Sequence, residues 1–154
     1  MTTIAFDGKT LAADTQISQK LFKSYAHKIF LLPNGIVCAG AGDWGLLNRL
    51  RDLLAQGKKL TGVLTKKQLS EVDMLYLKEG QCYELNASYM GYMPCTCTPV
   101  AIGSGSEIAW AFMVAGMSAK KAIEATSKVR SCTNNVIDVY DFKRKAFSLA
   151  NFPE

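Results

Sequence analysis

The sequence contains a single histidine, His27, among its 154 residues. A serine or cysteine hydrolase with a histidine base would have to use this one residue. Zinc ligands are equally scarce: Cys95 and Cys97 are spaced more closely than in the usual zinc knuckle, and no second cysteine pair follows them. The composition therefore argues against most histidine-dependent hydrolases, and we expect neither a metal site nor a cofactor.

Long apolar runs and a leader-like start are also missing. The longest stretch without charge, apart from Glu84, runs from Tyr83 to Ser106 and is broken by polar and proline residues, so it does not resemble a membrane-spanning helix. No basic region followed by an apolar core is present at the start, as a secretion signal would require. Five cysteines at irregular spacing suit reduced thiols better than disulfides; they are Cys38, Cys82, Cys95, Cys97 and Cys132. We therefore expect a cytoplasmic protein without a membrane partner.

The basic residues are not concentrated in one motif, although the net charge is +5 and the isoelectric point is near 9.0. Such a charge raises the question of nucleic-acid binding. The lysine and arginine clusters are short, dispersed and free of interleaved aromatic residues; they lie at 58–59, 66–67, 120–121 and 143–145. This pattern is typical of solvated faces and turn tips, and we expect no nucleic-acid partner.

Glycine, asparagine and proline turns divide the chain into recognisable elements, and its length predicts one domain, residues 1–154. The alternation of apolar residues predicts hairpins from 3–6 with 10–15, 26–32 with 36–40, 72–77 with 81–85, and 136–142 with 146–149, and extended segments at 88–93 and 100–102. Helical spacing predicts helices between Asp43 and Gly57, from Glu107 to Ala115, and after Ser118. Four strands before the first helix, and two helices late in the chain, favour an α+β fold with antiparallel sheets.

The most informative residue is Thr2, which directly follows Met1 and opens a strand-like run that ends at Phe6. Its side chain is small enough for an aminopeptidase to remove Met1. The new terminus would then carry a hydroxyl and a free α-amine on one residue, which is a nucleophile together with its own general base. Threonine is common at this position, so the catalytic interpretation depends on the residues that follow.

Several short motifs follow Thr2 in a specific order; they are Gly8, Ala12-Ala13-Asp14-Thr15, Lys28-Ile29, Ala39-Gly40-Ala41-Gly42 and Ile102-Gly103-Ser104-Gly105. Together they resemble the threonine peptidases of the proteasome β-subunit type, especially the bacterial HslV branch. The likeness covers Thr2 to about Leu54 and Val100 to Phe142, and it is weak between them. It implies a four-layer αββα sandwich of two antiparallel sheets, as in N-terminal nucleophile (Ntn) hydrolases. Only residues 57–70 stand where the family has a long second helix, so we expect one helical layer to be reduced.

The same resemblance assigns candidate roles. Thr2 would be the nucleophile, Lys28 would favour its neutral amine, and Asp14 would hold Lys28. Gly42 N–H would stabilise the oxyanion, Ser104 would contact the terminal amine, and Thr133 would place a second hydroxyl near the nucleophile.

Each of these residues also has an ordinary interpretation: Asp14 could form a turn, Lys28 could be a surface lysine, Gly42 could allow a tight turn, and Ser104 could cap a helix. Two positions depart from the family: Arg130 replaces an aspartate, and Asp43 stands where small residues are usual.

The leading hypothesis is a peptidase that cleaves polypeptide with the Thr2 hydroxyl. The resemblance implies a homo-oligomeric ring and a separate ATPase unfoldase as partners. One alternative is a catalytically silent assembly protein, favoured by Arg130 and by the missing helix; a retained Met1 would acylate the amine and remove the base. Another alternative is a small-molecule amidase with the same nucleophile, which the sequence does not distinguish from a peptidase.

Overall fold

A computed structural model describes residues 2–19, 22–131 and 133–153. Within these ranges, ten strands form two five-stranded antiparallel sheets. Across the first sheet the order is β10 (Val100–Gly103), β1 (Thr3–Phe6), β2 (Thr10–Asp14), β11 (Ile137–Asp141) and β12 (Ala146–Ser148). Across the second sheet the order is β5 (Ile29–Leu31), β6 (Val37–Gly42), β7 (Val72–Lys78), β8 (Gln81–Asn86) and β9 (Gly91–Pro94).

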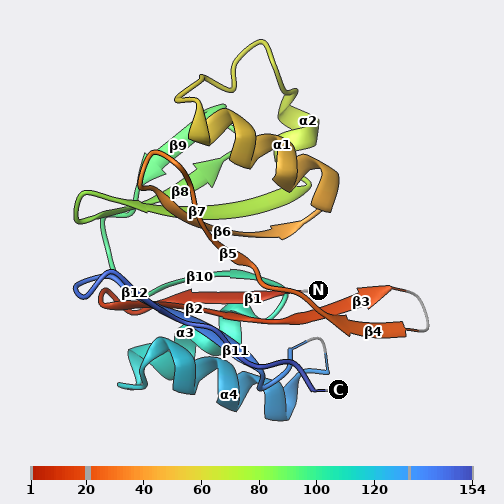
Figure 1. The fold of residues 1–154 in the computed structure, drawn as a ribbon, viewed down its shortest axis with the longest axis vertical. Coiled ribbons are helices and arrows are strands. Elements are labelled where there is room, and N and C mark those ends of the chain that lie inside the picture. Colours follow the sequence, from red (N-terminus) through yellow and green to blue (C-terminus); the bar gives the residue numbers. More distant parts are fainter. Residues whose placement is uncertain (1, 20–21, 132, 154) are drawn as a thin grey trace.

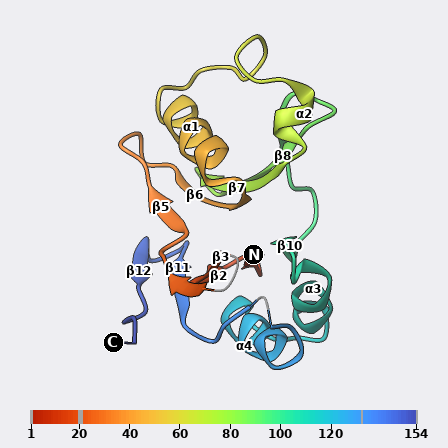
Figure 2. The same cartoon turned by 90° about the vertical axis from the view of Figure 1, so that its right-hand side faces the viewer.

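The two sheets lie between two pairs of helices (Figures 1 and 2). The pair beside the second sheet is α1 (Trp44–Ala55) and α2 (Lys66–Leu69), and the pair beside the first sheet is α3 (Ser106–Val114) and α4 (Ala119–Val129). The α1 side is packed with leucines, whereas the α3–α4 side is packed largely with alanines. A third apolar cluster fills the space between the sheets. None of the helices in the described ranges is long and apolar enough to cross a membrane.

Local side-chain chemistry explains the first hairpin. The Oδ1 atom of Asp7 accepts hydrogen bonds from the backbone N–H groups of Lys9 and Thr10, both at 2.8 Å. Gly8 adopts a φ of 98°, which glycine allows without strain. This turn sets β1 against β2, and the predicted hairpin at 3–6 with 10–15 is confirmed. The other three predicted hairpins are confirmed as well, although β5 begins three residues later than predicted.

The predicted helices are also confirmed, because their caps are local signals. Asp43 accepts a hydrogen bond at 2.9 Å from Leu46 N–H and caps α1. Ser118 accepts one at 3.3 Å from Lys121 N–H and caps α4. Apolar residues of both helices face the sheets, and the α+β class with antiparallel sheets is confirmed.

One local prediction is wrong. Six strands, rather than four, precede α1, because β3 (Gln16–Gln19) and β4 (Phe22–Tyr25) form an additional hairpin. All four β4 residues are exposed, so no buried face produced an apolar alternation in the sequence. The segment 57–70, which stands where the family has a long helix, contains the single-turn helix α2, with a capping box between Thr65 and Gln68.

Candidate active site

Thr2 lies immediately before β1, at the end of the sheets where β6 and β10 end and β7 begins. Its carbonyl oxygen accepts a hydrogen bond at 2.8 Å from Ser104 N–H and a longer one at 3.4 Å from Ser104 Oγ. Thr2, Gly42 and Ser104 line one pocket of about 350 Å³. Three predicted site residues therefore meet around one open space.

Glycines allow the close backbone approach at this pocket. Gly103 has a φ of 93°, and a Cβ atom added to it would overlap the carbonyl oxygen of Thr2. Gly42 has a φ of 113°, and a Cβ atom there would overlap the carbonyl oxygen of Glu71. A larger residue at Gly103 would push β10 away from Thr2, and one at Gly42 would push β6 away from the start of β7.

A buried ion pair between Asp14 and Lys28 is hydrogen-bonded to Thr3, the residue that follows Thr2. Lys28 Nζ is 3.0 Å from Asp14 Oδ1, and the two side chains are 1% and 0% exposed. Asp14 Oδ1 also accepts a hydrogen bond at 2.8 Å from Thr3 N–H, and Lys28 Nζ donates at 2.6 Å to the carbonyl of Gln16. Burial raises the pKa of Asp14, while the charge of Lys28 and these N–H donors oppose that shift. The lysine charge is therefore fixed in place beside the first strand.

Thr133 reaches the same network from the end of α4. Its Oγ1 atom lies 2.6 Å from Thr3 Oγ1, and both threonines are buried. The contact joins Thr133 to the residue after the candidate nucleophile. Arg130, which replaces the family's aspartate, is exposed at the end of α4 and takes part in neither ion pair found in the described ranges.

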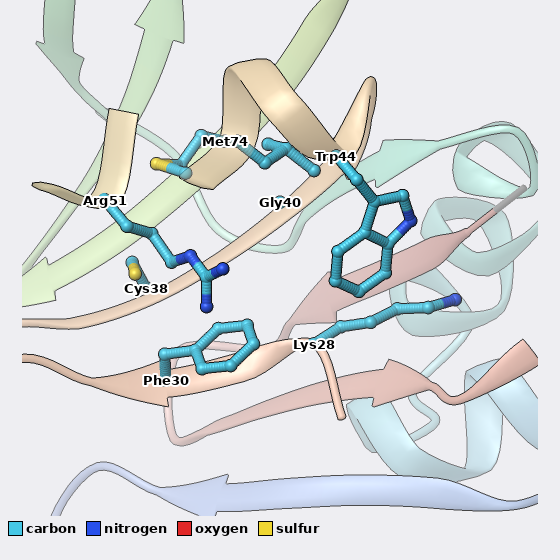
Figure 3. Close-up of a pocket in the computed structure, with 8 residues that line it drawn as sticks. Lys28, Phe30, Cys38, Gly40, Trp44, Arg51 and Met74 are labelled. Atoms are coloured by element: carbon cyan, nitrogen blue, oxygen red, sulfur yellow. The ribbon is translucent and has the colours of Figure 1, made fainter. Parts of the chain in front are cut away.

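A second, much smaller pocket lies along the stem of Lys28 (Figure 3). Its volume is about 10 Å³, close to that of a single water molecule. The Arg51 guanidinium lies 3.7 Å from the ring centre of Phe30, and the Lys28 ammonium points away from it. Burial raises the pKa of Cys38 to about 12, so this thiol stays protonated and unreactive. The pocket is too small to hold an amino-acid side chain.

Sequence reasoning missed one participant, Gln16, and one side-chain pair, His27 with Asp138. Gln16 holds Lys28 through its carbonyl and donates its N–H to Asp14 Oδ2 at 3.3 Å. In the sequence, only its position two residues after Asp14 indicates that Gln16 could contact this pair. His27 pairs with the buried Asp138 at 2.6 Å, a contact between residues 111 positions apart that no sequence pattern indicated. In the described part of the chain, no group of three or more histidines, cysteines or acidic residues could hold a metal ion. Met1 and Cys132 lie outside the described residues.

Comparisons with known proteins find solved structures with a similar fold. No protein-family model matches the chain, and no curated protein matches it. HslV from Trypanosoma brucei superposes with a TM-score of 0.64 at 19% identity, over 90% of this chain and 97% of that one. Anbu, an ancestral β-subunit from Yersinia bercovieri, gives 0.64 at 13% identity, over 91% and 80%. BPH from Thiobacillus denitrificans gives 0.65 at 14% identity, over 97% and 98%.

These likenesses establish the fold. The chain is structurally similar to HslV, Anbu and proteasome-like β-subunits, which share the Ntn-hydrolase fold. The resemblance inferred from the short motifs around Thr2 is thus confirmed at the level of structure. At sequence identities of 13% to 19%, this structural similarity shows the fold and not the activity.

Proposed function

We propose that this chain is an N-terminal threonine peptidase whose nucleophile is the hydroxyl of Thr2 after removal of Met1. One observation carries the proposal: Asp14 of the buried Asp14–Lys28 pair accepts a hydrogen bond from the N–H of Thr3, the residue next to Thr2. Burying two charges is costly, and a purely structural role would be served as well by apolar residues. A lysine held in this way beside a threonine at the end of the chain suits the activation of a nucleophile.

The α-amine of Thr2 is the proposed general base. Its ordinary pKa of about 7.7 to 8 is already close to neutrality, and a fixed cation nearby favours the neutral form. The amine takes the hydroxyl proton as Oγ1 attacks the peptide carbonyl, and then returns it to the departing amine. Water, activated by the same amine, hydrolyses the resulting ester. Asp14 and Gln16 keep Lys28 charged and in place throughout.

The negative charge of the tetrahedral intermediate needs a donor in the pocket. The proposed donor is Gly42 N–H, at the junction where β6 leads into α1 and where the positive end of the helix dipole lies. Ser104 and Thr133 act as positioning residues in this scheme. Their described contacts hold the backbone of Thr2 and the hydroxyl of Thr3.

The proposal also covers architecture and partners. Three apolar clusters in succession support a single αββα domain, residues 1–154, with the α1–α2 layer reduced because α2 is one turn long. A solvent-open peptidase would endanger its cell, so the proposed assembly is a cytoplasmic homo-oligomeric ring that receives polypeptide from a separate ATPase. The support for this assembly is the fold shared with HslV and Anbu.

The deciding experiment is an intact-mass measurement before and after treatment with a peptide epoxyketone. This reagent reacts with a hydroxyl and a free α-amine on the same residue. We expect a starting mass without Met1 and one adduct, and we expect the Thr2→Ala variant to stay folded without forming the adduct or cleaving peptide. Adduct formation with Thr2→Ala would refute the assignment.

A second candidate is a catalytically silent assembly protein on the same fold. The exposed position of Arg130, outside the network around Asp14 and Lys28, favours it. A retained Met1 together with no adduct would support this candidate over the peptidase.

A further inference from the structure

A groove of about 860 Å³ lies at the end of the two sheets opposite Thr2. It is formed where the hairpin turns of both sheets come together, toward the left of Figure 1. The turns that line it include Gly8, Asn34 with Gly35, residues 78–80, and Lys143 with Lys145. None of the residues used in the proposed peptidase mechanism lines this groove.

Positive charge surrounds the groove. Its lining includes four exposed lysines and a single acidic residue, Glu79; the lysines are Lys9, Lys78, Lys143 and Lys145. In the described ranges, neither the Lys28–Asp14 ion pair nor the His27–Asp138 contact involves any of them. The four ammonium groups are therefore available for carboxylates from outside the chain.

The floor of the groove is apolar. Leu31 is 61% exposed here, although the neighbouring Val37 and Leu77 are almost fully buried in the cluster between the sheets. Phe142 and Phe147 are half-buried on the other side. A large apolar side chain entering the groove would cover Leu31 and contact both sheets at once.

The turns present the lysines from a fixed backbone. Asp141 Oδ1 accepts a hydrogen bond at 2.9 Å from Arg144 N–H, and Lys145 follows with a φ of 53°. Asp7 holds the turn at Lys9 through a 2.8 Å hydrogen bond to its N–H group. A ligand would therefore meet a preorganised backbone and would need to order only the lysine side chains.

We propose that this groove docks an acidic segment of a partner polypeptide that carries large apolar side chains between its carboxylates. The carboxylates pair with the four lysines, and the apolar side chains pack on Leu31 and the half-buried phenylalanines. A nucleic acid fits less well because its bases need free aromatic faces. Phe142 already packs edge-on against Phe6, and Phe147 packs at a tilt against Tyr140. The proposal does not depend on the activity of Thr2.

The test measures fluorescence anisotropy of a labelled peptide that alternates glutamate with phenylalanine, titrated with the full chain. We expect saturable binding that weakens as salt rises. Reversing two charges in Lys78→Glu/Lys143→Glu should weaken binding by about tenfold or more. The matched control is Lys120→Glu/Lys121→Glu, which changes the net charge equally on the exposed face of α4. The control should bind like the unaltered chain.

An apolar variant separates docking from simple charge attraction. Leu31→Ser should weaken binding of the peptide that contains phenylalanine. It should not change binding of a peptide with serine in place of phenylalanine. Circular dichroism establishes that each variant is folded. Equal losses in the groove and control charge variants would overturn the proposal, as would no binding of the peptide. Preferential binding of a duplex DNA probe with the same lysine dependence would overturn it in favour of a nucleic-acid surface.

Discussion

At the Thr2 end of the sheets, Asp14 and Lys28 are buried and paired with each other at 3.0 Å. At the turn end, Lys78 and its three lysine neighbours are exposed and outside any ion pair in the described ranges. A buried charge keeps its strength and its position because water does not screen it, whereas an exposed charge is mobile and screened. The first arrangement suits chemistry at one atom, and the second suits attraction of a partner.

The glycines of the two ends differ in the same sense. Gly103 has a φ of 93° and lies directly against the backbone of Thr2, whereas Gly35 has a φ of 82° and has no atom within 4 Å of an added Cβ. Glycine at the turn end satisfies the backbone angle alone. Glycine at the Thr2 end satisfies the angle and also leaves room for the backbone of Thr2.

The largest effect is expected from removing the buried lysine charge. Lys28→Met leaves Asp14 buried without its partner and should reduce the free energy of unfolding by about 3–5 kcal/mol. Lys78→Met makes the same chemical change at the turn end and should change it by less than about 0.5 kcal/mol. Urea unfolding of both variants measures the difference. Similar losses in the two variants would show that burial does not distinguish the ends.

A somewhat smaller effect is expected from the glycines. Gly103→Ala combines a strained φ with an overlap on the Thr2 carbonyl and should cost about 3 kcal/mol. Gly35→Ala meets only the strained φ and should cost about 1 kcal/mol. Thermal unfolding gives the stabilities, and the rate of epoxyketone labelling should fall for Gly103→Ala alone. Unchanged labelling in that variant would mean that the close approach does not position Thr2.

The buried hydroxyl pair should contribute less. Thr133→Val removes the partner of Thr3 Oγ1 in a buried site and should cost about 2 kcal/mol. Thr10→Val at the turn end removes a 2.9 Å hydrogen bond to Asp7 Oδ2, where water can replace the lost partner, and should cost about 1 kcal/mol or less. Urea unfolding again compares the two. A larger loss for Thr10→Val would contradict the contrast in burial.

The smallest effect is expected in the pH dependence of stability, where Asp7 and Asp14 should contribute with opposite signs. At the turn end, partial burial opposes ionisation of Asp7, but hydrogen bonds from backbone N–H groups outweigh it and lower the pKa below the ordinary 3.8. Its contribution to stability is therefore present above pH 3.8 and is lost as the pH falls through the pKa of the folded state. At the Thr2 end, burial raises the pKa of Asp14. Its contribution is present below pH 3.8 and is lost as the pH rises through the folded-state pKa.

Unfolding free energies of Asp7→Asn and Asp14→Asn, each subtracted from those of the unaltered chain between about pH 3 and pH 7, test these signs. The Asp7 difference should grow in favour of the unaltered chain as the pH rises, and the Asp14 difference should shrink. Parallel slopes would show that the two carboxyl groups share one kind of environment.

Turns and caps were predictable because each depends on a few adjacent residues. Asp7 with Gly8 was enough to predict the first hairpin, and Asp43 was enough to predict the start of α1. The β3–β4 hairpin was missed because the exposed strand Phe22–Tyr25 has no buried face to impose an alternation. The capping box at Thr65 was present in the sequence, but one helical turn lacks the periodicity that reveals a longer helix.

The candidate site was predictable mainly through resemblance. Asp14 and Lys28 were assigned because they match family positions, and no local pattern predicted their burial. The Thr3–Thr133 contact joins residues 130 positions apart. Gln16 contributes through its backbone, so its side-chain type gave no indication of its role.

The sequence by itself determined which segments form hairpins and helices, because turn angles, caps and apolar spacing act over a few residues. It also placed a threonine next to the start of the first strand. Only the tertiary structure decided that Asp14 and Lys28 meet inside the protein, and that four lysines from different turns surround one groove. Burial and pairing depend on which distant strands pack together, and the packing of two sheets is a property of the whole chain.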